Sequence, residues 1–202
     1  MRRRFLLVAP AVLALARCAS PDPAIYTLRA VPGSAASGGP MAIKVARPGL
    51  AGYLDRPEIV RDNSVSRLTL NSGERWGEPL GDMVGRVLAL DLAQRLPGSS
   101  VFTEAGTISV DPSATVELDI QRFDLDTGGS VILLAQVAVQ QGRAHDPAAT
   151  HSLRLTVQPA STGTPDVVAA MSGALGQLAD SVADLLRALS PRALTPPTAR
   201  RR

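Results

Sequence analysis

Few residues of this chain have side chains that could carry out chemistry, and their spacing limits what they could do. The only cysteine is Cys18, and the two histidines are His145 and His151. Neither histidine has a cysteine or a second histidine pair at the spacing of a metal site. His145 precedes Asp146 and could form an acid–base couple with it, but a solvated loop is the more common setting for such a dipeptide.

The carboxylates also lack the pattern of an active site. The pairs Glu117/Asp119 and Asp124/Asp126 fall on alternate positions, so each pair shares one face of a strand and keeps it soluble. The sequence contains no G-x-S-x-G, P-loop, G-x-G-x-x-G, H-E-x-x-H or C-x-x-C motif. These features predict a protein that is not an enzyme, with no metal, no cofactor and a role in binding or assembly.

Cys18 follows a leader that is typical of exported proteins. Arg2, Arg3 and Arg4 precede an apolar run over residues 5–16, which is shorter than the roughly 20 residues of a membrane-spanning helix. Residues 15–18, at the end of the leader, resemble a lipobox and predict acylation of Cys18. Arg17 stands where lipoprotein processing favours a small residue. The alternative is cleavage after Ala16 and release into the periplasm.

The charge of the chain is concentrated at its ends. The whole sequence has 21 basic and 18 acidic residues, a net charge of +3. Without the four arginines of the leader and the four of the C-terminal tail, 13 basic residues remain against 18 acidic ones. A mildly acidic core with five aromatic residues is unlike a nucleic-acid surface, which needs clustered cations and stacking rings. Nucleic acid is therefore not expected as a partner.

The hydrophobic periodicity predicts an α+β fold. Apolar residues recur every three or four positions over 80–96 and 166–189, which indicates two helices. The apolar stripe of the helix over 166–189 is compatible with a coiled-coil contact or with packing on a sheet, and packing on a sheet is expected here. The other segments predict a mainly antiparallel sheet of about five strands, with both helices packed on it. Extended stretches are expected at 25–28, 41–47, 53–60, 66–70, 116–121, 131–140 and 151–158, with turns at 62–64 and 127–130 and a break in alternation at 122–123.

Two segments rich in arginine, aromatic residues and proline are the best candidates for a partner-binding site, because these types dominate interface hot spots. The first holds Tyr53, Leu54, Asp55, Arg56 and Pro57, and the second holds Arg75, Trp76, Glu78 and Pro79. Two alternatives remain open at this point. Trp76 is as well suited to the core as to a surface, and Asp55 and Arg56 could pair within one subunit.

These segments, with the lipobox cysteine and the Tyr26-Thr27-Leu28 strand, closely resemble the ABC-type transport auxiliary lipoprotein family of PqiC/YmbA-like proteins. The shared motifs are "YLDRPxIV" at 53–60 and "RWxEPL" at 75–80, and the resemblance extends over 26–189. It implies a non-catalytic subunit of an MCE-type lipid transport system that links the inner and outer membranes. The implied partners are an MCE-domain protein, an inner-membrane permease or ABC transporter, and further copies of the chain in a ring-like homo-oligomer. The implied location is the periplasmic face of the outer membrane, or the periplasm if Cys18 is not acylated. The alternative function is a soluble periplasmic carrier that binds lipid itself.

The predicted organisation has four parts. Residues 1–17 form a signal peptide, and 18–40 a lipid-anchor tether and flexible linker that includes the short strand 25–28. Residues 41–189 form a PqiC-like α+β domain, and the proline-rich, basic tail at 190–202 is expected to be disordered.

Overall fold

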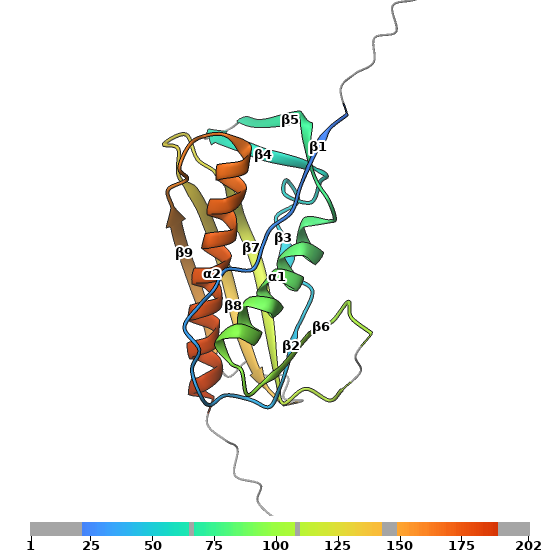
Figure 1. Cartoon of the computed structure of the whole chain (residues 1–202), viewed down its shortest axis with the longest axis vertical. Coiled ribbons are helices and arrows are strands. Elements are labelled where there is room, and N and C mark those ends of the chain that lie inside the picture. The colour runs from blue at the N-terminus through green and yellow to red at the C-terminus, as the bar shows by residue number, and fades with distance from the viewer. Residues whose placement is uncertain (1–21, 65–66, 108–109, 143–148, 190–202) are drawn as a thin grey trace, which may run out of the picture.

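The computed structural model describes residues 22–64, 67–107, 110–142 and 149–189. Helices α1 (Leu80–Arg95) and α2 (Thr164–Ala188) lie against each other and cover one face of a curled sheet (Figure 1). The leader, Cys18, His145 and the tail at 190–202 lie outside the described residues. The predicted helices are confirmed, and α2 packs on the sheet and on α1.

The long strand β7 (Ala114–Leu125) is the centre of the sheet. On one side it pairs antiparallel with β8 (Val131–Gln141), which pairs with β9 (Ala149–Val157). On its other side it pairs in parallel with three segments in succession, and the outer strands continue from these. The three segments are β2 (Ala42–Val45), β3 (Gly49–Leu50) and β4 (Glu58–Ser64); β6 (Ser100–Thr103) extends from β2, while β5 (Arg67–Trp76) and then β1 (Ala24–Tyr26) extend from β4.

The predicted α+β class is confirmed, but the predicted sheet was too small and too uniform. The described residues form a nine-stranded sheet that mixes parallel and antiparallel pairs. β1 and β2 overlap the extended stretches predicted at 25–28 and 41–47, whereas β3 and β6 were not predicted. These two have two and four residues, too few for a periodic pattern, and they pair with strands far away in sequence.

The hairpin of β7 and β8 agrees with its sequence signals. The ladder between the strands shifts register between Ile120 and Arg122, so the predicted break in alternation at 122–123 corresponds to a bulge and not to a strand end. Gly129 in the turn has a φ of +80°, the conformation that glycine adopts most readily. Because the bulge adds one residue to the strand, the residues after it face the side of the sheet opposite to the one that unbroken alternation from Val116 would give.

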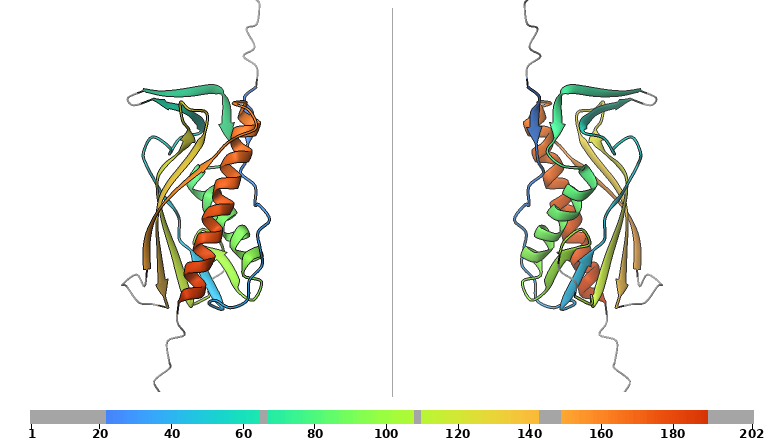
Figure 2. Two further views of the ribbon diagram at one scale, coloured as in Figure 1. Left: turned by 90° about the vertical axis from the view of Figure 1, so that its left-hand side faces the viewer. Right: turned by 90° about the vertical axis from the view of Figure 1, so that its right-hand side faces the viewer.

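Strands β4 and β5 form an arm that runs across one end of the molecule and projects beyond the sheet on the side away from the helices (Figure 2). The predicted turn at 62–64 is wrong, because these residues belong to β4. Polar residues favour turns in general, but they also occur within strands. β1 pairs with the base of the arm, where β5 ends, so that Ala24 to Tyr26 lie beside Glu74 to Trp76.

The space between the helices and the sheet is filled by side chains. A single hydrophobic cluster joins residues of both helices to the inward faces of β7 and β8, and many of them are completely buried, among them Met83, Leu92, Val137, Leu175 and Leu178. The interior between the helices and the sheet is therefore a closely packed hydrophobic core.

Residues 27–40 cross the two helices and are held there by a buried arginine. Arg95 is 2% exposed, and its guanidinium donates hydrogen bonds to the carbonyl oxygens of Val31 (3.1 Å) and Gly176 (3.0 Å). Its Nε lies 2.6 Å from Oδ1 of Asp180 on α2. The fully buried Asp91 accepts a hydrogen bond from the Val31 backbone N–H at 2.7 Å. The crossing segment and both helices thus share one polar cluster.

Candidate partner-binding surface

The two segments predicted to bind a partner lie side by side, because β4 begins and β5 ends at the same place. The backbone N–H of Trp76 donates a hydrogen bond to the carbonyl oxygen of Pro57 at 2.8 Å, and Glu58 is the cross-strand neighbour of Arg75. Gly77 then donates to the carbonyl oxygen of Tyr26. A surface made from both motifs is therefore available at the base of the arm.

Within these motifs, the largest apolar side chains belong to the core. Leu54 is 1% exposed and Trp76 is 7% exposed. Successive residues of a strand point to opposite faces, so burial of Trp76 leaves Arg75 exposed on the other face and the two side chains do not stack. Of the two possible roles for Trp76, the structure favours the core.

Tyr53 fixes the loop before β4 to the sheet. Its hydroxyl donates a 2.7 Å hydrogen bond to Oδ2 of Asp124, whose Oδ1 lies 2.9 Å from Nε of Arg122. Asp124 is completely buried, so the expectation that the Asp124/Asp126 pair keeps a strand face soluble is wrong for this residue. Burial, and next the hydrogen bond to this carboxylate, raise the pKa of Tyr53. The phenol therefore stays protonated and keeps donating. Tyr53 is a positioning residue for the loop.

Four of the nine predicted residues are exposed: Asp55, Pro57, Arg75 and Pro79. Arg56 is half-buried, and its Nε has no hydrogen-bond partner among the described residues. No ion pair joins Asp55 to Arg56 in the described part of the chain. The internal pairing that the sequence left open is thus not seen there.

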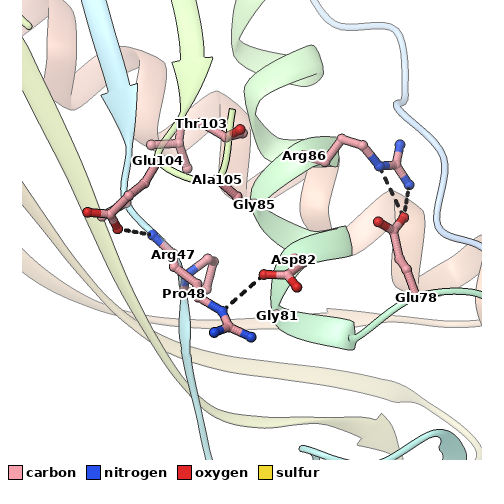
Figure 3. A pocket seen from close by; sticks show the side chains of 12 residues that line it. Arg47, Pro48, Glu78, Gly81, Asp82, Gly85, Arg86, Thr103, Glu104 and Ala105 are labelled. Carbon is pink, nitrogen blue, oxygen red and sulfur yellow. Dashed lines mark hydrogen bonds and ion pairs between the residues drawn. The ribbon is translucent and has the colours of Figure 1, made fainter. Parts of the chain in front are cut away.

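Glu78, the ninth residue, lies at the rim of a pocket of about 210 Å³ beside the start of α1 (Figure 3). Its carboxylate is paired with Arg86, which lies in the second turn of the helix. On the other side of the pocket, Nε of Arg47 lies 3.0 Å from Oδ1 of Asp82. The backbone N–H of Arg47 donates a hydrogen bond to Oε2 of Glu104. The rim is therefore charged on both sides.

Two glycines of α1 form the floor of this pocket. Gly81 and Gly85 are four residues apart and so share a face of the helix. A Cβ at Gly85 would lie 3.2 Å from Cδ of Pro48, and one at Gly81 would lie 3.4 Å from the Pro48 carbonyl oxygen. The glycines let the corner after β2 approach the helix closely. Sequence reasoning missed this pocket, although the glycine spacing was a visible signal.

No group of three or more His, Cys, Asp or Glu side chains that could hold a metal ion occurs in the part of the chain that the structure describes. In the same residues, no helix is both long enough and apolar enough to cross a membrane.

Comparison with known proteins gives a family and a fold. The family model of the ABC-type transport auxiliary lipoprotein component matches residues 26–183, a range that includes both motifs. A crystal structure of an uncharacterized protein is similar, with 15% identity, a TM-score of 0.67, and coverage of 81% of this chain and 98% of that one. A protein of the DUF330 family from Xanthomonas campestris has 21% identity, a TM-score of 0.60, and coverage of 81% and 92%. No curated protein matches the chain.

Proposed function

Since this chain belongs to the family of ABC-type transport auxiliary lipoprotein components, we propose that it is the non-catalytic auxiliary lipoprotein of an MCE-type lipid transport system. In this role it is anchored through Cys18 at the periplasmic face of the outer membrane. Several copies associate into a ring that receives an MCE-domain protein, which in turn works with an inner-membrane permease or ABC transporter. The family match carries this proposal, because it spans both motifs and nearly all of the described chain.

The exposed residues at the base of the arm are the proposed docking surface for the MCE-domain protein. Asp55, Pro57, Arg75 and Pro79 are held on a rigid frame, since Tyr53, Leu54 and Trp76 fix the two segments from beneath. An anchored frame lowers the entropic cost of binding. The pocket beside Glu78 continues this surface and has room for one side chain of a partner.

The packing of the interior weighs against the alternative function of a lipid carrier. A carrier needs an apolar cavity that encloses most of its ligand, commonly of about 300–1,000 Å³. In this chain the space between the helices and the sheet is occupied by core side chains. A surface for protein binding requires no such cavity.

The docking surface predicts a separation between binding and stability. Replacing Arg75 with alanine should weaken binding to the purified periplasmic part of the MCE-domain protein by about tenfold or more, since arginine is a common hot-spot residue. Its free energy of unfolding should change by less than about 0.5 kcal/mol, because the side chain is exposed. Arg154→Ala, at an exposed arginine on β9, is the matched control and should leave binding unchanged.

Tyr53→Phe provides the opposite case. Loss of the hydroxyl leaves the buried Asp124 without one of its donors, and a hydrogen bond to a charged group contributes about 1.5–3 kcal/mol. This variant should therefore unfold at lower urea concentration but bind the partner normally while folded. The docking proposal fails if Arg75→Ala binds as tightly as the unmodified protein, or if it loses binding only in proportion to lost stability.

A further inference from the structure

The end of the molecule that carries β1 and the β4/β5 arm has three of the six large apolar side chains that are exposed among the described residues. Among the described residues, Ile25, Leu68 and Leu70 are 63%, 38% and 42% exposed. Leu68 and Leu70 are two positions apart on β5, so they project from the same face of the strand. The last turn of α2 lies at the opposite end of the molecule (Figures 1 and 2).

The position of Cys18 determines what this end faces. Cys18 precedes Asp22, the first described residue, by four residues. Even a fully extended chain spans no more than about 3.6 Å per residue, so the sulfur of Cys18 lies within roughly 15 Å of the start of the described chain. When acyl chains hold Cys18 in a bilayer, the end with β1 and the arm is the part of the protein nearest to the lipid.

We propose that Leu68 and Leu70 on the arm form a second membrane contact that reinforces the acyl anchor. Ile25 is not part of this contact, because it is the cross-strand neighbour of Arg75 and lies with the docking surface at the base of the arm. This contact rests on the proposed function, because it takes the anchored state for granted. Acyl chains on Cys18 supply the stable attachment, and apolar side chains that enter the interface add to it in proportion to the apolar area that they bury. The arm is well placed for this role, since it runs across the end of the molecule beyond the sheet (Figure 2).

The strand geometry limits the depth of the contact. Among the described residues, β5 pairs only with β4 between Leu68 and Leu70, and β1 joins it from Glu74 onward. The backbone groups on the free edge must keep water or lipid headgroups as partners, because none are available in the hydrocarbon region. The side chains of the two leucines therefore enter the interface while the strand stays at headgroup level.

The test uses the complete exported chain with Cys18→Ser, which removes the acyl anchor and the only thiol. A Leu70→Cys substitution in this chain then carries an environment-sensitive nitrobenzoxadiazole label. With vesicles of phosphatidylethanolamine and phosphatidylglycerol, its emission should shift to shorter wavelength. The same label at Leu90→Cys, on the exposed face of α1 and 48% exposed in the native residue, should not shift.

Unlabelled variants measure how much the leucines contribute. Leu68→Asp with Leu70→Asp should lower vesicle partitioning of the Cys18→Ser chain by about tenfold or more, and Met41→Asp should have no effect. Thermal unfolding verifies that each variant is folded. The proposal is overturned if the label at position 70 does not shift with vesicles, or if it shifts with protein concentration in their absence, which would identify a second copy as the occupant. Neither result depends on acylation, so the anchor of the proposed function is judged separately.

Discussion

Replacing Arg95 with alanine is expected to lower the free energy of unfolding by about 3–5 kcal/mol, as removal of one partner from a buried ion pair does. The variant leaves the fully buried Asp91 without the nearby guanidinium, whose Nη1 lies 3.8 Å from its Oδ1. It also leaves the carbonyl oxygens of Val31 and Gly176 without their donor. Equilibrium unfolding in urea measures the change.

Two further variants make this result specific. Arg187→Ala removes an exposed arginine that contacts the same crossing segment through the Ser37 carbonyl oxygen, and it should cost less than about 0.5 kcal/mol. Gly33→Ala keeps every charge but places a Cβ against the Arg95 guanidinium, so this group must shift from its present position among its hydrogen-bond partners. It should therefore destabilise far more than Arg187→Ala. Equal effects of Arg95→Ala and Arg187→Ala would show that the cluster does not hold the segment.

The pH dependence of stability reports on the same cluster. Burial raises the pKa of Asp91, and the Val31 N–H and then Arg95 partly oppose this effect. The folded protein thus retains a proton that the unfolded chain loses near the ordinary value of 3.8, so this carboxyl lowers stability as pH rises through that window. The curve for Asp91→Asn should lack this component.

Cys18→Ser is expected to move the protein from the membrane fraction to the soluble periplasm almost completely. Acyl chains on Cys18 are the stable part of the attachment, and the contact through Leu68 and Leu70 is reversible on its own. Fractionation of the cell envelope, with an intact mass of the detergent-extracted protein, measures both the location and the modification. The outcome that contradicts acylation is an unmodified protein already in the soluble fraction with Arg17 as its first residue.

The helices and the central hairpin were predictable because their signals are local. The apolar residues of α1 and α2 recur within each helix, and the observed bounds lie within two residues of the predicted ones. The bulge near Arg122 was visible as a break in alternation. In contrast, β3 and β6 were not predicted, since two to four residues give no periodicity and their partners are distant in sequence.

The candidate site was predictable as a place but not in its detail. The motifs at 53–60 and 75–80 could be recognised, yet nothing local shows that the Tyr53 hydroxyl meets a carboxylate 71 residues further along the chain. Arg95 was hidden for the same reason. It stands beside the apolar stripe of α1, and its role depends on Asp180 and Gly33, which only the tertiary fold brings to it.

Isolation of the intact protein from its own membranes tests the central claim most directly. The complete chain carries an affinity tag at its C-terminus, and the envelope is cross-linked briefly before mild detergent extraction. We expect the MCE-domain protein to be recovered with the tagged protein, and its recovery to fall sharply for Arg75→Ala but not for Arg154→Ala. Recovery of the tagged protein without an MCE-domain protein, with one bound phospholipid per chain, would contradict the proposed function and identify a carrier.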